Sequence, residues 1–382
     1  MSGWPMVKLG ELMRKTKSID PRKSPEILFQ LFSIPAYDNG YPELIRGKEV
    51  GSSKTILQDS DVVLSKIVPH IRRTWVIPRG DNRIGSSEWI VFNDTRFDPI
   101  FVAEYLKSDV FHRQLLTTVA GVGGSLNRAR PAAVADLKIP LPPLDEQKRI
   151  AEILGGVADA AKSVDEQLRQ AKTLRSSLVS FANTLAIEQR PIVEYFDLNC
   201  KQPRNIDDHE PTSFIPMSNV DETFGVSPIP STFSEHKKGY TFFENGDVLL
   251  AKITPCFENG KSAIAKLPTR FGHGSTEFHV LHPKILGTVD YRISVPLVAA
   301  IIKERSFLKP AENFMRGSSG HRRIPAWYIE GLKVPVLKKA DLKVVDDALV
   351  KVDDLLNLYH QKLTLLQELQ RSLSARAFAG QL

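Results

Sequence analysis

The chain has 382 residues, of which 42% are hydrophobic and 25% are charged, so two or more globular domains are expected and a disordered chain is excluded. The net charge of +7 suits a polyanionic partner such as nucleic acid without requiring one. With two cysteines, Cys200 and Cys256, and no apolar run of membrane-spanning length, the sequence shows no disulfide framework and favours a reducing, cytoplasmic setting.

The first predicted globular domain comprises residues 1–143. Short β-rich runs that are bounded by turn residues, at 62–67 and 88–92, predict strands. The 3.6-residue spacing of apolar side chains predicts helical structure over 99–116. This domain is therefore expected to mix α and β structure. It also holds much of the positive charge, because residues 1–140 contain 20 Lys and Arg against 15 Asp and Glu.

The first long helix is predicted over 144–187, directly after the prolines of "IPLPPLDEQKRIAEIL" (139–154). Proline is excluded from a helix interior, and Asp145 suits the N-cap position. Apolar residues then recur at heptad spacing over about four heptads, which is typical of a coiled coil. The stripe includes Ile150, Val157, Val164, Leu168 and Leu178.

The second predicted globular domain, 188–338, repeats the first. "DSDVVLSKIVP" (59–69) matches "NGDVLLAKITP" (245–255), and "GSSEWIVF" (85–92) matches "GSTEFHVL" (274–281). "GGSLNRARP" (123–131) corresponds to "RGSSGHRRIP" (316–325), and the domain boundary itself recurs 195 residues later. Matching blocks in one order indicate an internal duplication.

The second long helix is predicted over 339–382 and carries an equivalent stripe. Its members include Val345, Val352, Tyr359, Leu363 and Leu373. A helix of about 40 residues is about 60 Å long, which is too long for one domain to bury, so each stripe needs a partner. Repeats that are related by a two-fold axis require an antiparallel pair. We therefore predict an α+β protein with two similar mixed α/β domains that are separated by two long antiparallel helices, which form an intramolecular coiled coil. Two unrelated surface helices or a homodimeric coiled coil are the alternatives.

The boundary "LKIPLPPLDEQKRIAEIL" (137–154), which a Gly-Ser/Arg loop precedes and a heptad helix follows, resembles the DNA-specificity subunit of type I restriction–modification enzymes. The resemblance covers essentially the whole chain, although Lys338-Lys339-Ala340-Asp341 replaces Pro143-Leu144-Asp145-Glu146 at the second boundary. It implies two target-recognition domains, 1–143 and 188–338, each of which reads one half of a split double-stranded DNA site. It also implies spacer helices that dock two methyltransferase subunits, and separate motor-nuclease subunits. S-adenosylmethionine, ATP and Mg are expected in those partners and no cofactor in this chain.

Candidate DNA-binding side chains follow strands or lie in the Gly-Ser/Arg loops, where base-edge donors and phosphate-binding cations are needed. In the first domain they are Lys66, Arg72, Arg73, Asn127, Arg128 and Arg130, and in the second Lys252, His321, Arg322 and Arg323. Solvated surface charge is the alternative for each of these residues. For Trp75, Trp89 and Phe278 we expect core packing in preference to stacking on bases.

Catalytic motifs are not expected in this chain. "PCFENGKS" (255–262) ends like a P-loop but has Pro255 where the first glycine is required, and the histidines have no metal-ligand spacing. Two further functions stay open: the recognition subunit of a related system whose partner fuses methyltransferase and nuclease, and a two-headed structural adaptor that does not bind DNA.

Overall fold

The computed structural model describes residues 3–120, 127–221, 225–284, 291–318 and 320–382, and it contains two compact units. Unit 1 comprises Met1–Lys162 and Thr364–Leu382, and unit 2 comprises Ser163–Leu363. Each unit therefore contains one globular domain together with parts of both long helices. In the described residues, no helix has the length and apolar character that crossing a membrane requires.

In unit 1 the globular domain is built from several small sheets. The largest has the strand order β2 (Ser18–Ile19), β5 (Lys54–Ile56), β8 (Arg83–Gly85), β3 (Leu28–Phe32), β4 (Glu43–Arg46). The next has the order β7 (Thr74–Val76), β6 (Val62–Ser65), β9 (Trp89–Phe92). Two ladders pair β1 (Met6–Lys8) with β12 (Lys138–Pro140), and β10 (Val119–Ala120) with β11 (Arg128–Ala129).

The helices of this domain are short. They are α1 (Leu9–Leu12), α2 (Ile34–Asn39), α3 (Pro99–Lys107), α4 (Asp109–Leu116) and α5 (Pro131–Ala135). The helical pattern over 99–116 thus forms two helices, because Ser108 has an extended backbone and its hydroxyl accepts a hydrogen bond from the Phe111 amide, which starts a new helix.

Unit 2 contains the second globular domain with corresponding sheets. One has the order β18 (Ile229–Thr232), β15 (Pro211–Ile215), β22 (Phe271–Gly274), β19 (Thr241–Glu244), and another β14 (Phe196–Leu198), β23 (Phe278–Pro283), β20 (Val248–Ala251), β21 (Ser262–Ile264). A three-stranded sheet has the order β13 (Glu188–Pro191), β25 (Lys333–Lys338), β24 (Tyr291–Arg292). A two-stranded sheet pairs β16 (Val220–Asp221) with β17 (Gly225–Val226). The helices are α7 (Phe233–His236), α8 (Val295–Ile301), α9 (Arg305–Ala311) and α10 (Ala326–Glu330).

The two domains share one topology. The order β5-β8-β3-β4 corresponds to β19-β22-β15-β18, and in both sheets the central pair is parallel while its neighbours are antiparallel. Likewise β7-β6-β9 corresponds to β21-β20-β23, with antiparallel pairs throughout. The similarity of the two mixed α/β domains that the sequence predicted is therefore confirmed.

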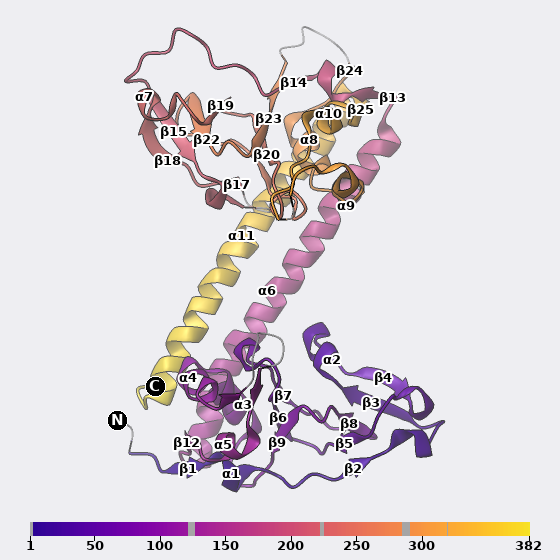
Figure 1. Cartoon of the computed structure of the whole chain (residues 1–382), viewed down its shortest axis with the longest axis vertical. Coiled ribbons are helices and arrows are strands. Elements are labelled where there is room, and N and C mark those ends of the chain that lie inside the picture. Colours follow the sequence, from indigo (N-terminus) through magenta and orange to yellow (C-terminus); the bar gives the residue numbers. More distant parts are fainter. Residues whose placement is uncertain (1–2, 121–126, 222–224, 285–290, 319) are drawn as a thin grey trace. The chain divides into compact units, whose positions relative to one another are not determined.

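Each unit contains contacts between the two long helices, α6 (Leu144–Leu185) and α11 (Lys339–Phe378), which Figure 1 shows. In unit 1 the start of α6 shares a buried core with the end of α11, through Ile150, Leu154 and Phe378. In unit 2 the later part of α6 packs against the earlier part of α11, through Leu168 and Leu356. Both sets of contacts require antiparallel helices, so the intramolecular pairing is confirmed over the homodimeric alternative.

The heptad residues lie on the packed faces of the helices. Five of them are buried: Ile150, Val164, Leu168, Val345 and Val352. Five are partly buried: Val157, Leu178, Tyr359, Leu363 and Leu373. The expected N-cap was wrong, because α6 already begins at Leu144; Asp145 lies in its first turn, where a negative charge favours the helix dipole.

Candidate nucleic-acid interface

In the first domain, backbone hydrogen bonds bring together three segments that lie far apart in the sequence. Lys66 follows β6; its amide donates to the Glu88 carbonyl at 3.0 Å, and its carbonyl accepts from the Ala129 amide at 2.8 Å. Ile67 forms a bridge with Arg128. The half-exposed Arg128 side chain then reaches Glu88, with Nε 3.4 Å from Oε2.

The second domain builds the same arrangement. The Lys252 amide donates to the Glu277 carbonyl at 2.8 Å, and the Lys252 carbonyl accepts from the Ile324 amide at 2.8 Å. Ile253 forms a bridge with Arg323. Here the ion pair is bidentate, since Arg323 Nε and Nη2 lie 2.9 and 2.7 Å from the two carboxylate oxygens of Glu277. We call each group, Lys66/Glu88/Arg128 and Lys252/Glu277/Arg323, a Lys–Glu–Arg cluster.

The Arg323 guanidinium holds the pKa of Glu277 below its ordinary value, chiefly through the hydrogen bonds between the two side chains. Glu277 is therefore ionised at neutral pH and lies among cationic side chains. Arg323 also donates from Nη1 to the His321 carbonyl at 3.1 Å, which orients its guanidinium. A charged, planar and preoriented guanidinium suits a phosphate or the edge of a guanine.

Glu88 and Glu277 are the residues that the sequence analysis missed. The signal was present, because the aligned blocks "GSSE" and "GSTE" carry a glutamate at the same place in each repeat. In both domains this glutamate lies in the turn before a strand, β9 or β23, that pairs with the strand after which the lysine comes, β6 or β20. A carboxylate that recurs in both repeats beside a candidate phosphate-binding arginine indicates a functional site more strongly than either residue does alone.

The other candidates of the first domain have separate surroundings. Arg72 Nη1 donates to Asp109 Oδ1 at 2.6 Å, so it is tied to the start of α4. Arg73 is only 9% exposed and forms two hydrogen bonds with Asp38, at 2.7 and 2.8 Å, so its side chain holds the domain together. The backbone carbonyl of Asn127 accepts a hydrogen bond from the Val68 amide, and the Asn127 side chain takes no part in this contact. Arg130 is exposed.

In the second domain, His321 is exposed and Arg322 Nη2 lies 3.3 Å from Glu258 Oε1. Residues 121–126, which make up most of the Gly-rich loop that precedes Asn127, lie outside the described residues. The expectation of core packing for Trp89 and Phe278 agrees with their exposure of 5% and 2%.

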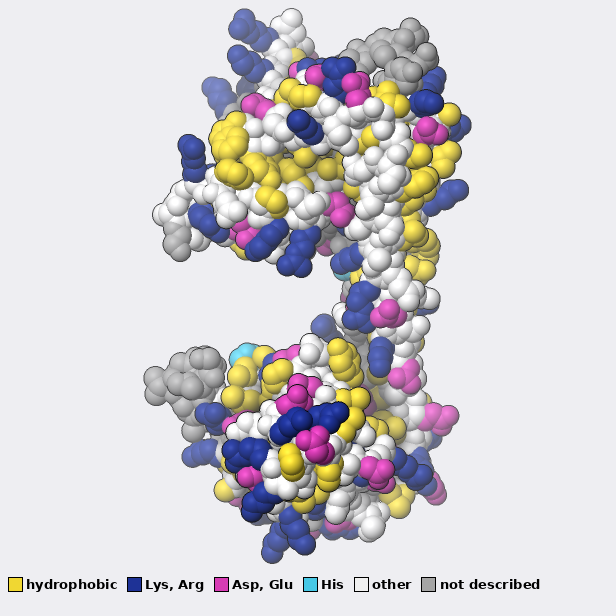
Figure 2. Space-filling model, turned by 90° about the vertical axis from the view of Figure 1, so that its right-hand side faces the viewer, with side chains coloured by type: hydrophobic (Ala, Val, Ile, Leu, Met, Phe, Trp, Pro, Cys, Tyr) yellow, Lys and Arg dark blue, Asp and Glu magenta, His cyan; other side chains and the backbone are white. Residues whose placement is uncertain are grey.

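Figure 2 shows many Lys and Arg side chains on one face of each unit, with some acidic side chains among them. Each Lys–Glu–Arg cluster is itself mixed in charge, because a carboxylate pairs with its arginine. Mixed surfaces favour discrimination over general adhesion to phosphate, because a misplaced duplex meets carboxylates as well as cations.

A second apolar stripe lies on α11, away from the face that packs on α6. Its exposed members are Val344, Leu355 and Leu358 in unit 2, and Leu365 and Leu369 in unit 1. At 100° per residue, the three of unit 2 fall within an arc of about 60°. Exposed apolar side chains at heptad-related positions are typical of a helix face that a partner helix covers.

The comparisons with known proteins agree with these features. Residues 1–170 match the family model of the type I restriction modification DNA specificity domain. The specificity subunits of the type I restriction enzymes EcoEI and EcoAI of Escherichia coli are 37% and 36% identical to this chain over 132 residues, which is 34% of this chain. The match spans only 21% and 22% of the length of these relatives.

Two solved structures share the fold over nearly the whole chain. A chain from a study of complex assembly and conformational transition in the type I R-M system has a TM-score of 0.51, 19% identity and coverage of 100% and 99% of the two chains. The S subunit of a type I restriction-modification system from M. genitalium has a TM-score of 0.60, 13% identity and coverage of 98% and 96%. The family resemblance of the sequence is thus confirmed over residues 1–170, which match the model of the type I restriction modification DNA specificity domain.

Proposed function

We propose that this chain is the cytoplasmic sequence-specificity subunit of a type I restriction–modification complex, in which each globular domain reads one half of a bipartite DNA site. The observation that carries the proposal is the Lys–Glu–Arg cluster, which the structure builds in each domain from the same three segments. Because the residues around the two clusters differ, the two half-sites are expected to differ in sequence.

Within each cluster the roles follow from chemistry. Lys66 and Lys252 would neutralise phosphates as flexible point charges, and Arg128 and Arg323 would bind phosphates or guanine edges with planar geometry. Arg73 is left out of this assignment because it is buried on Asp38.

The long helices would set the non-specific spacer and dock the partners. The exposed stripe of Val344, Leu355 and Leu358 supports the docking role, because one packed face already satisfies the pairing of α11 with α6. Two methyltransferase subunits would bind S-adenosylmethionine, and motor-nuclease subunits would use ATP and Mg. This chain would contribute recognition and no catalytic step.

The test uses the full chain with fluorescent duplexes in which one half-site, the other, or neither is scrambled. Arg128→Ala should weaken binding only where its own half-site is intact, and Arg323→Ala should do so for the other half. A lost bidentate base contact costs about 1–3 kcal/mol. Equal losses of both variants on both scrambled probes would contradict the assignment of one half-site per domain. Binding that does not weaken with salt would favour the structural adaptor, because phosphate contacts impose a steep salt dependence.

A further inference from the structure

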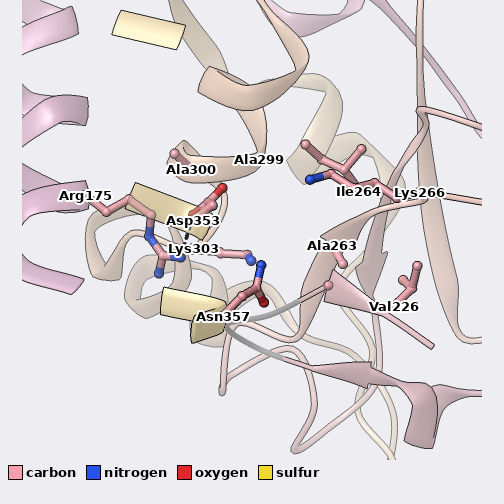
Figure 3. A pocket seen from close by; sticks show the side chains of 11 residues that line it. Arg175, Val226, Ala263, Ile264, Lys266, Ala299, Ala300, Lys303, Asp353 and Asn357 are labelled. Atoms are coloured by element: carbon pink, nitrogen blue, oxygen red, sulfur yellow. Dashed lines mark ion pairs between the residues drawn. The ribbon is translucent and has the colours of Figure 1, made fainter. Parts of the chain in front are cut away.

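A cavity of about 110 Å³ lies within unit 2, where α6, α11 and the second globular domain meet (Figure 3). Arg175 enters it from α6, and Asp353 and Asn357 enter it from α11. Lys303, which follows α8, and Lys266, which follows β21, line the remaining sides. The residues that line the cavity include none of the proposed DNA contacts.

Arg175 is the unusual member of this group. It is 9% exposed, and its buried Nε and Nη1 atoms have no hydrogen-bond partner among the described residues. Its acidic neighbour is Asp353, but Nη1 and Oδ1 are 3.6 Å apart, which is beyond a good hydrogen bond. Oδ1 of Asp353 is also buried without a hydrogen-bond partner in the described structure. Buried polar atoms are nearly always hydrogen-bonded, so a group bound in the cavity is expected to form hydrogen bonds with both Arg175 and Asp353.

The charges define what that group must be. The cavity is lined by three cationic side chains, Arg175, Lys266 and Lys303, against one carboxylate, Asp353. This excess favours an anion, and a cavity of this size admits several waters or one tetrahedral oxyanion of comparable volume. The carboxylate oxygen accepts hydrogen bonds only, so it requires a ligand that also donates one.

We propose that this cavity binds inorganic phosphate, an oxyanion that retains a proton at neutral pH. Its oxygens accept hydrogen bonds from Arg175 and the lysines, while its P–OH group donates to Asp353 Oδ1. Sulfate and the phosphodiesters of nucleic acid have no such proton at neutral pH, and phosphomonoesters have largely lost theirs, so Asp353 disfavours all three. The ligand is thus distinct from the DNA of the proposed function.

The buried arginine of this site belongs to the second half of the repeat. The residue 195 positions after Arg175 is Gln370, in unit 1. There the Gln370 amide donates to the Glu104 carboxylate at 2.9 Å, so a neutral, hydrogen-bonded side chain takes the place of the arginine, although Arg72, Lys107 and Arg113 line the cavity around it. The same comparison supplies a substitution, Arg175→Gln, that the helix accepts at the equivalent position.

Isothermal titration calorimetry on the full chain, without DNA, tests the proposal with inorganic phosphate, adenosine monophosphate, sulfate and a dinucleotide phosphodiester as probes. Phosphate should bind at least about tenfold more tightly than sulfate or the phosphodiester, as expected for a hydrogen bond to a charged group. Adenosine monophosphate, which is largely doubly ionised at neutral pH, should bind more weakly than phosphate. No binding of phosphate, or equal binding of phosphate and sulfate, would overturn the proposal.

Variants assign the binding to this cavity. Arg175→Gln should weaken phosphate at least about tenfold, whereas Arg169→Gln, on the same helix with a side chain that is 63% exposed, should leave it unchanged. Equal effects of the two would refute the site. Should Arg175→Gln fail to fold, Asp353→Ala decides, because it removes the oxygen that accepts from P–OH and should remove the preference for phosphate over sulfate. Retention of that preference would rule out the role of Asp353.

Discussion

Removal of the Glu277 charge should strengthen DNA binding while reducing its specificity. The carboxylate of Glu277 lies 2.7 Å from Arg323 Nη2, which lowers its pKa below the ordinary value, so it is fully ionised at neutral pH. A phosphate bound to Arg323 on the side away from Glu277 would lie roughly 6 Å from this negative charge. The Glu277→Gln variant keeps the shape of the side chain and removes the repulsion.

The size of the effect follows from Coulomb's law. One unit charge at roughly 6 Å in a water-like dielectric changes a binding constant by about threefold, and by more where solvent is excluded. The repulsion acts on any phosphate, so affinity should rise for scrambled and specific duplexes together. The specific duplex should gain less, because Glu277 also orients Arg323 toward its target, and the ratio between the two affinities should fall.

Fluorescence anisotropy at several salt concentrations measures both quantities. The increase should shrink as salt rises, since ions screen this interaction. Glu312→Gln is the matched control, because it breaks an exposed ion pair with Lys309 in the same unit but outside the cluster. If Glu277→Gln left the affinity for both duplexes unchanged at low salt, or lowered both, the placement of Arg323 against a phosphate would be refuted.

Further predictions concern stability and partner docking. Leu356→Ala should lower the free energy of unfolding by about 2–5 kcal/mol, because Leu356 is fully buried between α6 and α11; urea denaturation that shows no change would exclude this packing. Burial lowers the pKa of His273 to about 4. Between pH 6.5 and 4 the unfolded chain therefore binds a proton at this side chain that the folded chain does not bind. About 3 kcal/mol of stability, which is present above pH 6.5, should be lost as the pH falls through this range. His273→Phe, which keeps an aromatic ring against Phe233 and Phe242, should reduce that loss in urea titrations at pH 7 and 4.5, and an unchanged loss would contradict the assignment. The double variant Leu355→Glu and Leu358→Glu should retain DNA affinity but fail to co-purify with the methyltransferase subunit of the proposed complex, and normal co-purification would exclude this stripe as the docking face.

The sequence by itself determined the duplication, the two long helices and the members of their stripes, because these features rest on local periodicity and on matching blocks. Prolines 140, 142 and 143 marked where α6 begins to within one residue, since proline excludes a helix interior. The Lys and Arg positions of the clusters were also readable from the aligned repeats.

Only the tertiary structure decided which charges act together. Arg72 and Arg73 are neighbours in the sequence, yet one is half-buried on Asp109 and the other is buried on Asp38, because the chain turns between them and sends the two side chains to different elements. Glu277 and Arg323 are 46 residues apart and meet because two strands and a bridge bring their segments together. The Arg175 cavity has the same origin, since its five polar residues come from four separate segments and no local pattern connects them. Periodicity reports which face of an element is buried, whereas ion pairs and cavities depend on long-range packing, which a single sequence does not display.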